Sequence, residues 1–445
     1  MIPKTIPIPT PTPSALPYYT RIITDTIRLL FDQHFGKSVF PQSGSESGSG
    51  TGSATVSDSA VQLRLLEADY ELIHDLFIKN GTAGLFSNAL ESGLLELQGD
   101  EHLQQRFRTD LTYFANFARF RELRTNEVLV RLEQILQEKG FPYVILKGLA
   151  IKEAALYPEA WLRMSSDIDL LIEKKRVYEV AFALLDNGFQ LSLNKMFNLL
   201  DYSWQRNAEG FVFLRDKVGV EVHHSLHENS FLKWEDEQIW NPRLHSAARK
   251  QGCRHVFGLE MLLIHLLTHY FKHIHAMQES SNPAGHKFIW IVDLYAILRS
   301  EQQPVDWQLL KEHATGVLNC YEVCLFVLDA ALHFFPELWG CIPQEIQTDL
   351  AAERERNQQR YGISAADYAH LIRPNASESA AIARKMKLHP MKKWSRIQRA
   401  LYKYTILFPP VKTLQVHYNY RGTLKLPLCY LRHVLGMLRQ RIRKA

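Results

Sequence analysis

The feature that most constrains this chain is the stretch at residues 143–173, YVILKGLAIKEAALYPEAWLRMSSDIDLLIE. An apolar, β-prone run stops at Lys147-Gly148, a helical stretch and a polar loop follow, and a second strand contains Asp167 and Asp169. Side chains alternate along a strand, so these two carboxylates project from the same face. They repel each other unless a cation lies between them. The pattern therefore predicts a site for a hard, oxygen-binding ion such as Mg²⁺.

Three short motifs follow one another in order: LKG at residues 146–148, an Arg before SDIDLLI at residues 163–172, and VEVH at residues 220–223. Their order and spacing resemble the nucleotidyltransferase fold shared by polymerase beta, aminoglycoside nucleotidyltransferases and minimal nucleotidyltransferases. That pattern is an apolar strand, a glycine-containing turn, an Asp-x-Asp strand and a third carboxylate on a later strand. The residues of these motifs are similar to those of an uncharacterised bacterial branch of the superfamily. The resemblance covers residues 61–340.

The resemblance implies an α+β fold, in which a small mixed β-sheet forms the catalytic core and helical segments flank it on the N- and C-terminal sides. It also implies an enzyme that transfers a nucleoside monophosphate from an NTP to a hydroxyl or phosphate of an unknown acceptor, releasing pyrophosphate. Asp167, Asp169 and Glu221 would be catalytic and would hold two Mg²⁺ ions, with Mn²⁺ as the alternative. Glu221 would assist the acceptor's metal and take its proton. The alternative for these carboxylates is a solvated strand end.

The phosphate-binding residues that the resemblance implies are Lys147, Gly148, Arg163, Ser165 and Ser166. Arg163 is the main candidate for a triphosphate contact because its planar fork matches phosphate oxygens, and a surface salt bridge is its structural alternative. Leu149 follows the glycine where the wider fold usually has Ser or a second Gly. This departure leaves open a second hypothesis, a degenerate nucleotidyltransferase fold that binds or regulates without turnover.

Candidate acceptor-side residues are His223, His269, Lys287 and Asp293. His223 shares the strand face of Glu221, and a packed core histidine is an equal alternative. His269 belongs to a run of histidines spaced by four, which favours a helix face over a zinc site because no HExxH motif accompanies it. For Asp293 the alternative is an intramolecular ion pair.

The charges are distributed unevenly along the chain. Sixteen Lys or Arg and no acidic residue follow Glu378, whereas the preceding part holds 36 basic and 47 acidic residues. A basic tail on an acidic body suggests an anionic partner, and single-stranded nucleic acid, an anionic membrane surface and the protein's own body all stay open. The N-terminal segment lacks the apolar core of a signal peptide, no apolar run is long enough to cross a bilayer, and the five cysteines form no CxxC pair. A cytoplasmic protein is expected; the sequence does not predict its oligomeric state.

The expected domain organisation follows composition and periodicity. It consists of a Pro-rich segment with a helix (1–40), a flexible Gly/Ser linker (41–60), an N-terminal helical region (61–139), the catalytic core (140–245), a C-terminal helical region (246–378) and the basic tail (379–445).

Overall fold

The computed structural model describes residues 15–35, 60–192, 211–226, 239–240, 255–276, 288–300, 304–362, 409 and 411–444. The expected Pro-rich start and all but the last residue of the expected linker lie outside the described residues, as does Lys287.

A five-stranded mixed sheet forms the centre of the molecule, in the order β3-β4-β7-β6-β5. Its strands are β3 (Tyr143–Ile145), β4 (Asp167–Ile172), β5 (Gln190–Leu191), β6 (Phe211–Arg215) and β7 (Val218–His223). Strands β4 and β7 are parallel, and the other neighbours are antiparallel. Asp216 and Lys217 connect β6 to β7 with positive φ angles of 49° and 64°, as a tight two-residue hairpin loop requires. The predicted α+β fold is confirmed.

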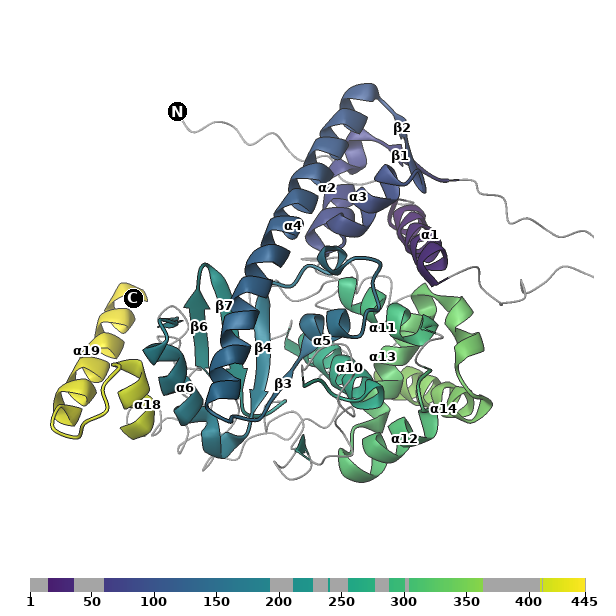
Figure 1. Cartoon of the computed structure of the whole chain (residues 1–445). Coiled ribbons are helices and arrows are strands. Elements are labelled where there is room, and N and C mark those ends of the chain that lie inside the picture. Colours follow the sequence, from purple (N-terminus) through teal and green to yellow (C-terminus); the bar gives the residue numbers. More distant parts are fainter. Residues whose placement is uncertain are drawn as a thin grey trace, which may run out of the picture.

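Helices cover this sheet. The long helix α4 (Glu101–Glu138) packs on β4 and β7, α6 (Val177–Asp186) packs on β5 and β7, and α5 (Lys147–Glu153) follows β3 directly. Asp100 caps α4 by accepting a hydrogen bond from the Leu103 backbone N–H at 3.1 Å. In Figure 1, α4 runs past the sheet and reaches the N-terminal part of the chain.

The expected all-helical region at residues 61–139 is wrong in two places. Strands β1 (Val61–Leu65) and β2 (Leu95–Gly99) pair in parallel beside α2 (Tyr70–His74) and α3 (Ala83–Glu91). Both segments alternate apolar and polar residues, but they are only five residues long, and short runs of this kind do not separate strand from helix by period. Their pairing joins segments about thirty residues apart, a contact that local sequence does not specify.

The helices between residues 259 and 361 form a second layer beside the sheet, shown in green in Figure 1. They are α10 (Leu259–Ala276), α11 (Ile289–Arg299), α12 (Trp307–Glu312), α13 (Tyr321–Phe334) and α14 (Gln344–Tyr361). The described chain also contains short 3₁₀ turns, at Glu67–Asp69, Ala160–Leu162, Lys174–Arg176 and Pro336–Cys341. Short π turns occur at Asp75–Lys79 and His313–Val317.

The first helix, α1 (Ala15–Phe35), packs on the body of the protein. Arg28 Nε donates to Glu337 Oε1 at 2.7 Å, and the Tyr19 hydroxyl donates to Asp69 Oδ2 at 3.1 Å. Helix α1 therefore joins the N-terminal unit, residues 61–99, to the C-terminal helices. The expected linker follows α1 in the sequence.

The described part of the basic tail contains α18 (Val411–His417) and α19 (Leu426–Lys444), which lie beside α6. No helix among the described residues is long and apolar enough to cross a membrane.

Asn80 connects the N-terminal unit to α11. Its side-chain Oδ1 accepts a hydrogen bond from the Phe288 backbone N–H at 3.0 Å, and its own carbonyl accepts one from the Ile289 N–H at 3.2 Å. Asn80 is fully buried, so its side chain and its backbone carbonyl each satisfy one backbone donor at the start of α11 that water does not reach.

We expect Asn80→Ala to lower the free energy of unfolding by about 1–3 kcal/mol, because it leaves the buried Phe288 N–H without its acceptor. Urea unfolding followed by circular dichroism measures the change. Asn116→Ala, at an exposed position of α4, is the matched control and changes stability by less than about 0.5 kcal/mol. Equal effects of the two substitutions would contradict this role of Asn80.

Candidate active site

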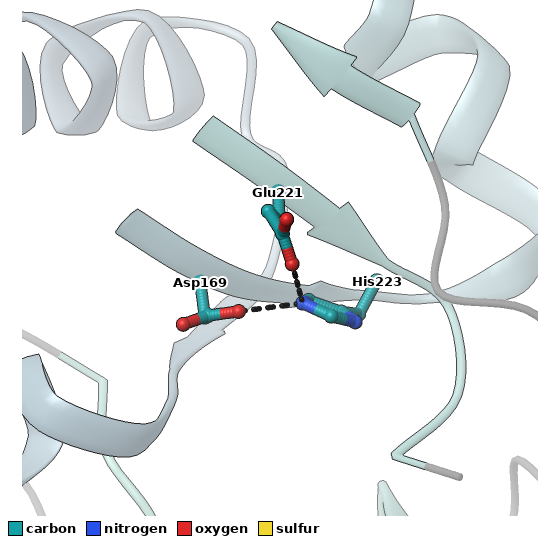
Figure 2. Close-up of side chains that lie close together, drawn as sticks. All are labelled: Asp169, Glu221 and His223. Carbon is teal, nitrogen blue, oxygen red and sulfur yellow. Dashed lines mark hydrogen bonds and ion pairs between the residues drawn. The ribbon is translucent and has the colours of Figure 1, made fainter. Parts of the chain in front are cut away.

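The parallel register of β4 and β7 brings two of the predicted carboxylates together. Asp169 on β4 lies directly opposite Glu221 on β7, and His223 follows two residues later on the same face of β7. His223 Nε2 lies 2.8 Å from Asp169 Oδ1 and 3.6 Å from Glu221 Oε2. Figure 2 shows the three side chains converging, and their ligand atoms all lie within 4.8 Å of one another.

Asp167 lies one step along β4 from this group. Its partner in the register is Gly219, which has no side chain, and the Ser166 hydroxyl donates to Asp167 Oδ1 at 3.0 Å. Burial raises the pKa of Asp167, and the charges of Asp169 and Glu221 raise it further. The three carboxylates thus repel one another, which is the electrostatic condition that a bound cation relieves.

Lys147 supplies a cation from within the chain. Its Nζ lies 2.6 Å from Asp169 Oδ1, the same oxygen that His223 Nε2 contacts. Burial acts to raise the pKa of Asp169, but the charge of Lys147 and the contact with His223 outweigh it and hold that pKa well below its usual range. Lys147 also has a positive φ of 54°, a conformation that costs a side-chain-bearing residue free energy. The turn after β3 therefore combines a strained backbone with an ammonium group that contacts Asp169.

Gly148 allows the polar loop before β4 to lie against the turn. A Cβ atom at this position would meet Ser165 Oγ at 2.5 Å, closer than real Cβ contacts allow, and Arg163 Nη1 at 3.2 Å, a tight contact. The Ser165 hydroxyl is buried and has no hydrogen-bond partner among the described residues. A buried hydroxyl without a partner is costly, and an acceptor supplied by a ligand would satisfy it.

Arg163 is held inside the protein. Its Nε and Nη2 donate to the two carboxylate oxygens of Asp293 at 2.6 and 2.7 Å, and its Nη1 donates to the Met164 carbonyl at 2.9 Å. The Tyr157 hydroxyl also donates to Asp293, at 2.8 Å. The alternative for Asp293, an intramolecular ion pair, is present; the salt bridge of Arg163 is buried and not at the surface as its alternative had it. Arg163 therefore anchors the loop to α11, and we do not retain it as a triphosphate contact.

The structure adds contacts that no sequence motif indicated. Lys152 on α5 forms an ion pair with Glu122 on α4, and the two side chains are only 5% and 12% exposed. Arg121, also on α4, donates to the carbonyls of Ser166 and Lys217, the latter at 3.3 Å. These contacts hold α5 and the loop against α4. Because their partners lie 30 to 96 residues apart, spacing along the chain carried no signal for them.

His265 on α10 lies near the same region. His265 is fully buried, and burial, with Lys147 and His223 nearby, lowers its pKa to about 3, so it is neutral at pH 7. His269 is also buried, with its ring centroid 5.9 Å from that of His265 and 5.5 Å from that of Trp290. The acceptor-side role of His269 stays a prediction.

The donor set suits a divalent cation. Asp167, Asp169 and Glu221 supply carboxylate oxygens, which Mg²⁺ and Mn²⁺ bind, and His223 supplies an imidazole nitrogen, which Mn²⁺ accepts more readily than Mg²⁺.

The raised pKa of Asp167 leads to a prediction for the metal-free protein. When a carboxyl group has a higher pKa in the folded than in the unfolded state, the protein loses stability as the pH rises. The loss begins near the unfolded pKa, about 3.9, and is complete above the folded pKa. We therefore expect Asp167→Asn to increase the free energy of unfolding at pH 7, because the variant carries no charge beside Asp169 and Glu221.

Thermal unfolding with a chelator present measures this effect, with Glu138→Gln on the exposed end of α4 as the control. Added Mg²⁺ should stabilise the wild type more than the variant, because binding to the folded state alone raises stability. A destabilised Asp167→Asn protein in chelator would show that the carboxylates do not repel as the geometry indicates.

Comparison with known proteins agrees with this geometry. A family model described as an uncharacterised nucleotidyltransferase matches residues 67–336, which is more than half of the chain. No curated protein and no solved structure matches. The matched residues include β3, the Lys147-Gly148 turn, the Asp167–Asp169 strand and Glu221. The chain belongs to the family of uncharacterised nucleotidyltransferases.

Proposed function

We propose that this protein is a divalent-metal-dependent nucleotidyltransferase that transfers a nucleoside monophosphate from an NTP to a hydroxyl or phosphate group of an acceptor and releases pyrophosphate. The observation that carries the proposal is the pairing of Asp169 with Glu221 across parallel strands, with Asp167 on the same face one step away. Family membership supports nucleotidyl transfer in general, and the carboxylate geometry supports the metal dependence.

Asp167, Asp169 and Glu221 would hold the metal, which we propose to be two Mg²⁺ ions, with Mn²⁺ as the substitute. When bound, the ions would neutralise charge on the triphosphate and lower the pKa of the attacking hydroxyl. His223 would keep Asp169 oriented through its 2.8 Å contact. This arrangement accounts for three closely spaced carboxylates that the metal-free fold tolerates only at a cost.

The proposed reaction is an in-line displacement at the α-phosphorus of the NTP. An acceptor oxygen forms a bond to the α-phosphorus, the bond from that phosphorus to the bridging oxygen breaks, and pyrophosphate leaves with the bonding electrons. Where the acceptor is a hydroxyl, Glu221 would receive its proton. The residues of the chain act mainly by positioning the reactants and by balancing charge.

Two groups would bind the phosphates of the NTP. The Ser165 hydroxyl, buried beside Gly148, would donate to a phosphate oxygen and so gain the partner that it does not have among the described residues. Lys147 would move its ammonium from Asp169 to the triphosphate, because a triphosphate carries more negative charge than a single carboxylate. Arg163 and Asp293 would keep the loop that bears Ser165 in place.

Two observations favour the second hypothesis, a protein that binds nucleotide without turnover. In this structure Lys147 already neutralises Asp169, and Leu149 replaces the usual hydroxyl or glycine of the turn. A site that keeps this ion pair with nucleotide bound would bind the triphosphate but would not assemble the metal for catalysis.

Calorimetric titration with ATP, GTP, CTP and UTP, each with Mg²⁺, tests the proposed function. We expect one NTP to bind with a metal-dependent affinity, and Asp167→Ala/Asp169→Ala to abolish that binding because the metal then has no oxygen ligands on β4. The matched control is Glu127→Ala/Glu138→Ala, which removes two exposed carboxylates of α4 and should leave binding unchanged. Binding of no NTP to the wild type, with Mg²⁺ or Mn²⁺, would refute the proposal.

The bound NTP, labelled at the α-phosphate, then identifies the acceptor by label transfer in a cell extract. Transfer that needs Glu221 indicates an enzyme. Metal-dependent binding without any transfer indicates the binding protein instead.

Lys147→Met should separate the two roles of this lysine. We expect its affinity for Mn²⁺ alone to rise roughly tenfold, because the ion no longer competes with a charge-assisted contact of about 1.5 kcal/mol at Asp169. Its affinity for the NTP should fall, since a phosphate contact is lost. Electron paramagnetic resonance of Mn²⁺ measures the first effect and calorimetry the second. Unchanged Mn²⁺ affinity would show that Lys147 does not occupy the metal's place.

A further inference from the structure

Helix α19 is attached to the catalytic core through its neighbours. The Thr413 hydroxyl of α18 lies 3.0 Å from the Tyr178 hydroxyl of α6, and Arg421, between α18 and α19, forms an ion pair with Asp186 at the end of α6. The Tyr430 hydroxyl of α19 donates to the Pro409 carbonyl at 2.8 Å. Figure 1 places α18 and α19 at the side of the molecule opposite the helices α10–α14.

The two faces of α19 differ in burial. Cys429 and His433, one helical turn apart, are buried. Leu428, Leu431 and Leu435 are 55%, 56% and 45% exposed, and Leu424, just before the helix, is 93% exposed. Spacings of three and four residues place the three helical leucines on one line along the outer face. Apolar residues aligned in this way, rather than scattered singly, mark an interaction surface.

Positive charge accompanies this leucine line. Lys425 and Arg432 are exposed beside it. In the sequence, Leu438 and Ile442 continue the spacing of the leucines, and cations recur at positions 439, 441, 443 and 444. No acidic residue follows Glu378, so the tail has no negative charges of its own to balance these cations. An aligned apolar face flanked by cations is typical of a helix that lies in the interface of an anionic membrane.

We propose that α19 binds an anionic lipid surface, with the leucine line inserted among the acyl chains and the flanking Lys and Arg side chains at the headgroups. A second copy of the chain fits less well, because two such helices would oppose cations without any acidic residue of the tail to pair with them. Nucleic acid would match the charge but would leave the exposed leucines without a partner, since single strands are bound by aromatic side chains that stack on bases.

This surface is independent of the proposed chemistry. It lies on α19, whereas the carboxylates lie on β4 and β7, and α6 is in contact with both α18 and the sheet. Binding at α19 would therefore hold the catalytic core near a membrane without contacting Asp167, Asp169 or Glu221.

Co-sedimentation of the full-length protein with vesicles tests the proposal. We expect binding to phosphatidylcholine vesicles that contain about 30% phosphatidylserine to be at least about tenfold tighter than to pure phosphatidylcholine, and to weaken between about 50 and 500 mM salt. Leu428→Ser/Leu431→Ser/Leu435→Ser should reduce the partition on the order of 100-fold, because burial of each leucine in lipid contributes about fivefold. Since these side chains are exposed, the variant should fold normally.

The control variant is Leu123→Ser/Val130→Ser, which removes two comparably exposed apolar side chains from α4 and should bind vesicles as the wild type does. Wild-type protein that stays in the supernatant, or a triple variant that binds vesicles normally, would overturn the proposal. A wild-type dimer in analytical ultracentrifugation that the triple variant abolishes, without vesicle binding, would assign the surface to a second copy. Binding to single-stranded RNA alone would assign it to nucleic acid. NTP titration of the same variants should be unchanged, so failure here does not bear on the proposed chemistry.

Discussion

The parallel pairing of β4 with β7 is the constraint on which the site depends. In that register Asp169 lies opposite Glu221, and Asp167 lies beside a glycine on the same face. A slip of one residue would turn one set of carboxylates to the other side of the sheet, where Ile168 and Leu170 are fully buried. The alternating apolar residues of both strands oppose such a slip, because burying a carboxylate in their place would cost several kcal/mol. The core therefore sets the geometry of the chemistry.

Buried ion pairs hold the surrounding elements in place. Arg163 with Asp293 connects the loop before β4 to α11, and Lys152 with Glu122 connects α5 to α4. Such pairs add little stability relative to an apolar core, but loss of one partner costs about 3–5 kcal/mol because the other charge stays buried. Their function here is positional. They hold the turn at Lys147 and the loop that bears Ser165 beside the carboxylates in the structure without a ligand.

The site also carries costs that the rest of the fold offsets. Lys147 has a left-handed backbone, Ser165 has a buried hydroxyl with no partner among the described residues, and Asp167 has a raised pKa. A bound phosphate would supply an acceptor for Ser165, and a bound metal would reduce the repulsion at Asp167, while backbone strain of the kind at Lys147 clusters at functional sites. Three such features within one turn, one loop and one strand are explained more simply by a ligand site than by three independent structural reasons.

The sequence alone predicted several local elements and indicated the nucleotidyltransferase family. The sequence predicted a strand that contains Asp167 and Asp169, which is β4, and a helix within residues 1–40, where α1 lies, and the motifs LKG, SDIDLLI and VEVH indicated the family. The tertiary structure decided what local pattern does not specify. In the tertiary structure the short segments β1 and β2 pair, and Arg163 forms an ion pair with Asp293. Lys152 forms an ion pair with Glu122, and a line of leucines on α19 stays exposed. The physical reason is that periodicity reports which face of an element is apolar, whereas the partner of a buried charge, or the absence of a partner for an apolar face, depends on residues far away in the chain.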